Sequence, residues 1–257
     1  MTIFYFTATG NSLSVAKRIG GNLVSIPQVV DSDDFQYQDD VIGVVFPIYS
    51  LNFPKMVRNF LEKAAFKADY TFIIVTCGGG VGKTLLEAEE FAKQNGYSFD
   101  YFAKVNMVDN CLPQWEMETE RKKVGKKDID GQLERIKNVI INRDKTDKIP
   151  IPGGRLLCWF SRTFFPIADD FHKNYIIDDK CNQCGTCAKV CPVKNIVISD
   201  KICFGDYCEG CQACIHVCPR SAIHLKRERS DKRWRNPEVT IKEIIESNNK
   251  PTKQQER

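Results

Sequence analysis

The sequence predicts an α/β domain with a doubly wound parallel sheet, followed by a small α+β domain. Up to about residue 148, apolar β-branched runs alternate with stretches of helical periodicity, which is the pattern of a parallel sheet covered by helices. Further along, most of the twelve cysteines fall in one duplicated block between Cys181 and Cys218. With 257 residues, the chain is long enough to bury one large and one small core.

Strands and helices alternate through the first domain, which we place at residues 1–148. The strands are expected at 3–6, 41–50, 70–77 and 99–108, and the helices at 12–21, 54–66, 83–96 and 128–145. Gly20, Gly21 and Gly96 are helix stops, and Pro54 begins a helix where a missing N–H costs little. In such a sheet a ligand binds beyond the carboxyl ends of the strands, where loops 7–12, 47–53 and 76–82 converge.

The loop after the first strand, TATGNS at residues 7–12, is suited to a phosphate group. Thr7, Thr9 and Ser12 offer hydroxyls, Gly10 gives the backbone freedom, and several N–H groups begin the following helix. The positive end of that helix favours a dianion without any cationic side chain. A capped helix that binds no ligand is the alternative interpretation.

This loop resembles the flavodoxin phosphate loop, T-x-T-G-x-T or S, between its strand and its helix. The resemblance implies a flavodoxin-like domain that binds FMN, with phosphate contacts at Thr7, Thr9, Gly10, Asn11 and Ser12. Flavodoxins cover the flavin ring with aromatic residues from later loops. In the loop that begins at Pro47, Tyr49 is the first choice for this role and Trp115 the second, although either could be a packed surface aromatic.

A second glycine-rich stretch, CGGGVGKT at residues 77–84, is nearly the phosphate loop of an ATPase. The ATPase motif needs a glycine where this chain has Cys77. The sheet also has a phosphate site already, after its first strand. We therefore expect Cys77, Gly78, Gly79 and Gly80 to form a rim where backbone amides approach the flavin ring. A cluster-bearing ATPase remains the third hypothesis for function.

Each copy of the cysteine block reads C-x-x-C-x-x-C-x-x-x-C-P. Three thiolates at this spacing can surround one [4Fe–4S] cluster, while the fourth reaches the cluster held by the other copy. The first cluster is thus assigned to Cys181, Cys184, Cys187 and Cys218, and the second cluster to Cys208, Cys211, Cys214 and Cys191. Two structural zinc sites are the alternative.

The segment 177–226 closely resembles a bacterial two-cluster ferredoxin. Nine apolar residues are expected to pack around the clusters: Ile177, Val190, Val193, Ile196, Ile198, Ile215, Val217, Ile223 and Leu225. Backbone amides near Gly185, Thr186, Gly210 and Ala213 are expected to approach the sulfurs. Four cysteines lie outside the repeat: Cys203 is expected to be a buried spare thiol or a substitute ligand, and Cys77, Cys111 and Cys158 fit no metal pattern.

Two further segments, 149–176 and 227–257, connect and follow these domains. The first starts with Pro and Gly and becomes aromatic, which favours a segment that packs the domains together over a membrane-surface helix. The second is basic, in a chain of net charge +4, and is expected to be solvated, with docking to an acidic partner or nucleic acid as the alternative. No apolar run could span a membrane and no signal peptide is evident, so we expect a cytoplasmic protein.

From TATGNS through FPIYSLNFPKMVRNFL and the cysteine block to RNPEVT, the chain is similar to the fused flavodoxin–ferredoxin proteins of the EFR-type ferrodoxin family. We predict electron transfer between FMN and two clusters, serving redox proteins that the sequence does not identify, with no nucleic acid bound. An oxidoreductase that reduces a small molecule at the flavin is the second hypothesis. It ranks lower because no catalytic acid or base is evident, and His172, His216 and His224 are expected to be packing or surface residues.

Overall fold

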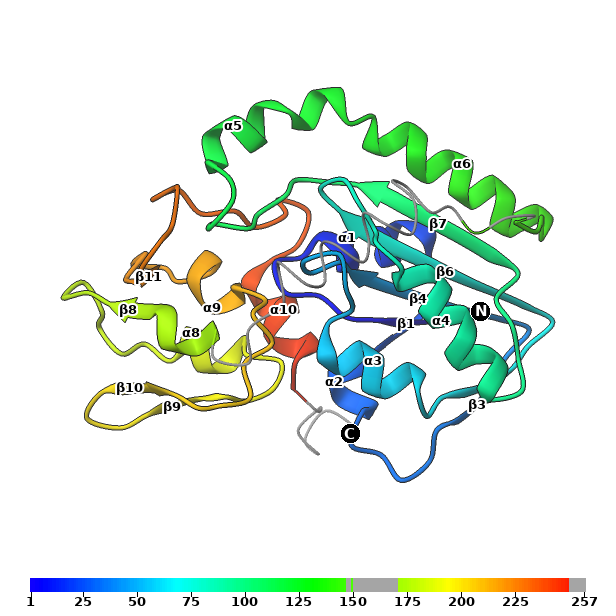
Figure 1. Cartoon of the computed structure of the whole chain (residues 1–257), viewed down its shortest axis with the longest axis horizontal. Coiled ribbons are helices and arrows are strands. Elements are labelled where there is room, and N and C mark those ends of the chain that lie inside the picture. Colours follow the sequence, from blue (N-terminus) through cyan, green and yellow to red (C-terminus); the bar gives the residue numbers. More distant parts are fainter. Residues whose placement is uncertain (147–148, 150–170, 250–257) are drawn as a thin grey trace.

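The computed structural model describes residues 1–146, 149 and 171–249, and its centre is a five-stranded parallel sheet (Figure 1). The strands are β1 (Thr2–Tyr5), β2 (Asn22–Ser25), β4 (Val41–Pro47), β6 (Tyr70–Cys77) and β7 (Tyr101–Asn106). Their order is β2-β1-β4-β6-β7, and β1 pairs with both β2 and β4, so the strand order reverses beside β1. The predicted doubly wound α/β class is confirmed.

Helices cover both faces of this sheet. One face carries α1 (Asn11–Ile19) and α6 (Ile129–Asn142), and the other carries α2 (Ile26–Val29), α3 (Lys55–Leu61) and α4 (Thr84–Gln94). The four expected strand and helix pairs are confirmed, with ends that differ by a few residues. The elements not predicted are short: β2, α2, the parallel pair β3 (Gln36–Gln38) and β5 (Ala65–Lys67), α5 (Met117–Lys122) and the 3-10 helix η1 (Val124–Lys126).

Side-chain alternation along β1 produces the two layers. Phe4 and Phe6 join the apolar cluster beneath α3 and α4, whereas Ile3 and Tyr5 join the cluster beneath α1 and α6. The central strand β6 is buried at every position, as expected for a strand covered on both faces. The apolar runs that predicted the strands therefore mark the middle of the molecule.

The second unit contains two antiparallel strand pairs and two short helices. β8 (Tyr175–Ile177) pairs with β11 (Ile223–Leu225), β9 (Ile196–Ile198) pairs with β10 (Ile202–Phe204), and α8 (Thr186–Lys189) packs against α9 (Ala213–His216). The 3-10 helix η2 (Phe171–Asn174) and β8 both start before the predicted boundary at residue 177. Residues 150–170 of the predicted packing segment, with Cys158, lie outside the described residues.

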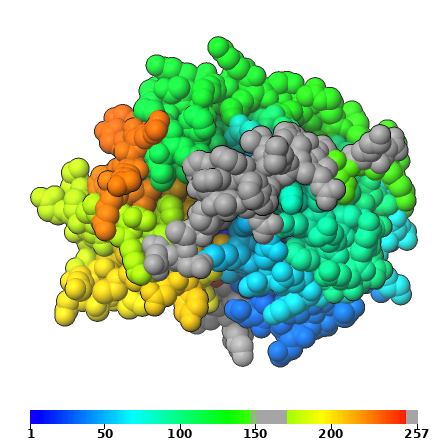
Figure 2. Space-filling model, in the orientation of Figure 1, coloured from blue at the N-terminus to red at the C-terminus, as the bar shows by residue number. Residues whose placement is uncertain are grey.

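The prediction of a solvated tail is wrong for residues 227–249. The segment ends in α10 (Ile241–Ser247), which starts with a capping box formed by Thr240 and Glu243. Val239, just before the helix, is fully buried. Figure 2 shows the orange part of this segment against the green surface near α5, and Ser230 Oγ donates to Glu116 Oε1 there at 3.0 Å. The free energy gained by burying the segment's apolar residues outweighs the preference of its charged residues for solvent.

The two units share one apolar cluster. Val190 and Val217, expected to pack around the iron–sulfur clusters, instead join Val239 and Ile244 on the sheet face beneath α1 and α6. Val193 packs against the cluster on the opposite face. A smaller core beside the cysteines keeps the predicted residues Ile196, Ile198, Ile215, Ile223 and Leu225. The chain therefore has no solvent layer between its two units at this point.

Candidate cofactor cavity and cluster sites

A cavity of about 580 Å³ lies at the carboxyl end of the sheet, between the loops that follow β1, β4, β6 and β7. Ten of the eleven residues predicted to bind the cofactor line it: Thr7, Thr9, Asn11, Ser12, Pro47, Tyr49, Cys77, Gly78, Gly79 and Gly80. Gly10 is absent from the wall, and so is Lys83 of the ATPase-like stretch. The structure thus brings the three predicted loops together around one space.

The phosphate loop leaves the start of α1 free to bind an anion. Gly10 precedes the helix with a φ of 96°, and no side chain caps the first turn. Thr7 Oγ1 accepts a hydrogen bond from Gly10 N at 3.2 Å, and Thr9 Oγ1 accepts one from Asn110 Nδ2 at 2.7 Å. Because each of these threonine oxygens acts as an acceptor, each hydroxyl keeps its own proton for donation.

The C-terminal segment lies directly behind the phosphate loop. Asn236 N donates to Thr9 O at 2.8 Å, and Asn236 Nδ2 donates to Asn11 Oδ1 at 3.2 Å. A Cβ placed on Gly10 would lie only 2.9 Å from Val239 Cβ, so the loop and the segment are in tight contact. Sequence analysis missed this support for the loop.

Tyr49 forms a wall of the cavity and stands on a tight turn. Tyr49 and Asn52 exchange backbone hydrogen bonds of 3.0 and 2.9 Å, and the two residues between them, Ser50 and Leu51, have φ values of 48° and 61°. The Tyr49 hydroxyl is buried and has no hydrogen-bond partner among the described residues. Its pKa is raised, first by burial and then by the nearby Cys211 and Glu209. A buried hydroxyl without a partner fits a site that a ligand completes.

The glycine-rich loop approaches its neighbours too closely for larger residues. A Cβ on Gly78 would lie 2.3 Å from Asp109 Oδ2, and one on Gly82, at a φ of 58°, would lie 2.2 Å from the carbonyl oxygen of Leu51. The loop is therefore held between the turn after Tyr49 and the loop after β7. This position agrees with the predicted glycine rim.

A fourth wall comes from the loop after β7, which sequence analysis did not assign apart from Trp115. Asp109, Cys111 and Gln114 line the cavity beside Trp115, which is 39% exposed. Asn11 Nδ2 donates to Val108 O at 3.3 Å and ties this loop to the phosphate loop. The sequence could have indicated this wall, because the loop follows the strand next to β6 and must emerge at the same edge of the sheet.

The cysteines predicted to hold the second cluster lie together beside this cavity. Four ligands predicted from both copies of the repeat, Cys191, Cys208, Cys211 and Cys214, line one small void of about 20 Å³. Cys211 also lines the large cavity, with its neighbours Gly210 and Gln212. Tyr175 closes the void, and its hydroxyl lies 3.6 Å from Cys208 Sγ. One residue, Cys211, therefore borders both spaces.

The cysteines predicted to hold the first cluster also come from both copies of the repeat, and two of them interact across the copies. Burial is the main reason that the pKa of Cys187 is raised to about 11, and the thiolates of Cys218, Cys184 and Cys181 raise it further. Cys218 belongs to the other copy of the repeat, so its proximity agrees with the predicted swapped ligand. Within this set Cys184 is exposed, Cys181 and Cys218 are partly buried and Cys187 is buried, so the set reaches the surface at Cys184.

Backbone N–H groups point at several of these sulfurs. Asn195 N, Gly210 N and Ala222 N donate to the sulfurs of Cys191, Cys208 and Cys218 at 3.2, 3.4 and 3.3 Å. Bonds of this kind tune the potentials of iron–sulfur clusters. No three His, Cys, Asp or Glu side chains in the described ranges are close enough to hold a single metal ion. Cys203 is exposed on β10, so its predicted burial is wrong.

The buried Glu209 side chain, in the loop predicted to hold the second cluster, forms hydrogen bonds with the first domain. Glu209, between Cys208 and Cys211, is 3% exposed. Its Oε2 accepts from Lys55 N at 2.8 Å and its Oε1 accepts from Met56 N at 2.7 Å. These amides begin α3, which has no side-chain cap from its own N-cap residue. The cluster loop thus caps a helix of the other unit.

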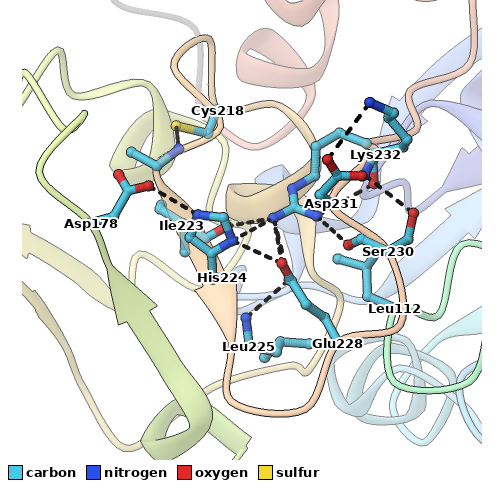
Figure 3. A network of polar contacts seen from close by, with 12 residues as sticks. Leu112, Asp178, Cys218, Ile223, His224, Leu225, Glu228, Ser230, Asp231 and Lys232 are labelled. Atoms are coloured by element: carbon cyan, nitrogen blue, oxygen red, sulfur yellow. Dashed lines mark hydrogen bonds and ion pairs between the residues drawn. The ribbon is translucent and has the colours of Figure 1, made fainter. Parts of the chain in front are cut away.

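The histidines have structural contacts and none lines the cavity. His216 Nδ1 accepts from Trp234 N at 3.1 Å, so its Nε2 donates to Asn110 O at 2.8 Å, and burial lowers its pKa to about 4. His224 lies between Glu228 and Asp178, at 2.8 and 3.2 Å (Figure 3). The expected packing role of these residues agrees with the contacts.

These features define an α/β protein with an attached iron–sulfur unit. The family model of the 4Fe-4S binding domain matches residues 174–197, so the chain carries such a domain and at least one [4Fe–4S] site. No curated protein matches the chain. No helix within the described residues could cross a membrane.

Two solved structures show weak similarity to part of the chain. A proposed flavoprotein from Bacteroides uniformis is 17% identical, with a TM-score of 0.31, over 47% of this chain and 95% of that protein. A proposed flavoprotein from Bacteroides eggerthii is 15% identical, with a TM-score of 0.30, over 49% of this chain and 96% of that protein.

Proposed function

We propose that this protein is an electron-transfer iron–sulfur flavoprotein that relays electrons between FMN and two [4Fe–4S] clusters. One observation carries the proposal: the cavity that contains the phosphate loop is also lined by Gly210, Cys211 and Gln212 of the second cluster motif. Electrons tunnel only across short gaps. A cluster ligand in the wall of a flavin cavity is the arrangement that such a relay requires.

The residues around the cavity fit FMN. The uncapped start of α1 and the hydroxyls of Thr7 and Thr9 would hold the phosphate, while Tyr49 and the rim from Gly78 to Gly80 would hold the ring. The unpartnered Tyr49 hydroxyl supports a polar ligand in this space. When bound, FMN supplies the connection between two-electron and one-electron chemistry.

The exposure of the cysteines supports an order for the relay. The second cluster would lie beside the flavin, because Cys211 borders the cavity. The first cluster would exchange electrons with a redox protein, because Cys184 is exposed. The proposal also includes membership of the EFR-type ferrodoxin family and a cytoplasmic location.

Cofactor content and rapid kinetics test the relay. Anaerobically purified protein is expected to hold about one FMN and about eight iron atoms per chain. Mixing cluster-reduced protein with an oxidant of the flavin should then show electron exchange between the two chromophores in stopped-flow spectra. Iron without flavin, or two chromophores that do not exchange electrons, would refute the proposal.

A small-molecule oxidoreductase is the second function we consider, and one residue favours it. Asp109 places a carboxyl group in the cavity wall, where sequence analysis found no catalytic acid or base. Turnover of an organic substrate by dithionite-reduced protein would support this function. Exchange with redox proteins alone would count against it.

A further inference from the structure

One acidic side chain stands in the wall of the large cavity. Among the described residues that line it, Asp109 is the only Asp or Glu, and none is Lys, Arg or His. Its carboxyl group lies against the glycine rim, since a Cβ on Gly78 would be 2.3 Å from Oδ2. Cys111 N donates to Asp109 Oδ1 at 3.2 Å, on the side of the carboxyl group away from Oδ2. The carboxyl group therefore has a defined orientation between the rim and its own loop.

The surroundings of Asp109 raise the pKa of its carboxyl group. Burial is the largest influence and raises the pKa of the carboxyl group, and the Glu120 carboxylate raises it further. The Cys111 N–H, the Trp115 side chain and the Lys127 ammonium act in the opposite direction without reversing the shift. The thiols of Cys77 and Cys111 also interact with this group: burial is the main reason that their pKa values are raised, and an ionised Asp109 raises them further.

The nearby lysine is held away from the cavity by other partners. Lys127 Nζ donates to the carbonyl oxygens of Met107 and Gly78, the latter at 3.4 Å. Glu120 is 3% exposed and pairs with Lys123. Neither Lys127 nor Glu120 lines the cavity. Among the carboxyl and ammonium groups of the described residues, Asp109 is therefore the one in direct contact with the cavity, where a ligand's charge would change.

We propose that Asp109 is the proton-exchanging residue of the cavity, an inference that rests on FMN as the occupant. Full reduction of a flavin ring takes up two electrons and at least one proton, and iron–sulfur clusters deliver electrons only. The two electrons arrive singly through the second cluster. Asp109 gives up its O–H proton to the ring as the electrons arrive and becomes a carboxylate. A hydronium ion from the solvent then returns one proton to Asp109, so the net uptake is two electrons and one proton, and the reduced ring keeps one negative charge.

The test compares the wild type with Asp109→Asn, which keeps the side-chain volume but cannot exchange a proton in this way. Glu120→Gln is the matched control, because it removes a neighbouring buried carboxyl group that does not line the cavity. Infrared spectra of the oxidised protein, recorded from about pH 5 to about pH 8, should show a protonated carboxyl band above the ordinary aspartate pKa. One carboxyl band of the wild type should be lost in Asp109→Asn and kept in Glu120→Gln, whereas any band from the buried Glu209, whose pKa is also raised by burial, is common to all three proteins.

The rate of flavin reduction provides the second measurement. In Asp109→Asn, reduction of the flavin by the clusters should slow by about 10²-fold and lose its pH dependence, with reduction of the clusters by dithionite unchanged. If Asp109→Asn kept every carboxyl band of the wild type, or reduced its flavin at the wild-type rate, the inference would be overturned while the relay stayed intact. Absence of flavin from the wild type would overturn the relay and this inference together.

Discussion

The contact between Glu209 and α3 can be tested by removing the carboxylate. In the wild type, Glu209 accepts from Lys55 N at 2.8 Å and from Met56 N at 2.7 Å while 3% exposed. The substitution Glu209→Ala leaves both amides without this acceptor. We expect the start of α3 to open more often, because a helix without a cap loses hydrogen bonds at its first turn.

The expected magnitude follows from the type of hydrogen bond. A bond from a backbone N–H to a charged group contributes about 1.5–3 kcal/mol. Burial raises the pKa of the Glu209 carboxyl group, so desolvation offsets part of this gain and we use the lower limit. About 1.4 kcal/mol corresponds to a factor of ten in an equilibrium constant, so the amides of Lys55 and Met56 should exchange roughly tenfold faster in Glu209→Ala.

Hydrogen–deuterium exchange with mass spectrometry measures this change in the peptide that contains Lys55 and Met56. Glu116→Ala is a control, because the Glu116 side chain caps α5 by accepting from the backbone N–H groups of Glu118 and Thr119, and it also accepts from Ser230 Oγ. The control should speed exchange near α5 and near Ser230 and leave the start of α3 unchanged. Unchanged exchange at the start of α3 in Glu209→Ala would refute the cross-domain cap.

Two further predictions concern the cofactors. Gly10→Ala should weaken FMN binding by about tenfold, because its φ of 96° costs an alanine about 1–2 kcal/mol and the Cβ would meet Val239; fluorescence titration measures this. Gly20→Ala, with the same φ and open space around its Cβ, is the control and should bind FMN normally. Cys184→Ala and Cys211→Ala should each lower the iron content from about eight to about four atoms per chain. Only Cys211→Ala should also abolish exchange with the flavin, and equal exchange in both variants would contradict the proposed order.

Local chemistry made much of this protein predictable. The strand Tyr70–Cys77 is apolar or β-branched along most of its length and is buried throughout, so its place in the sheet could be predicted from the pattern alone. The edge strand Asn22–Ser25 was missed because it is short and only partly buried. The assignment of the cysteines to two clusters has a different basis, since cysteine spacing along the chain restricts which thiolates can meet at one cluster, and it stays a prediction.

The unpredicted features depend on how distant segments pack. Nothing near Cys211 in the sequence indicates that it borders the same cavity as Tyr49 and Asp109, because that contact arises only when the two units dock. The basic composition of the C-terminal segment suggested a solvated tail. A contrary signal was present in the capping-box pattern of Thr240 and Glu243, which indicates the start of a helix.

The apolar cluster that contains Val190, Val239 and Ile244 has a consequence for biosynthesis. These side chains cover a sheet face whose first strand, with Ile3 and Tyr5, leaves the ribosome long before they do. Until the later segments are made, the nascent sheet exposes apolar surface of the kind that recruits chaperones or aggregates. Folding of the α/β domain is therefore completed only after both cysteine repeats have been synthesised, which makes cluster insertion and final packing of the sheet neighbouring events in time.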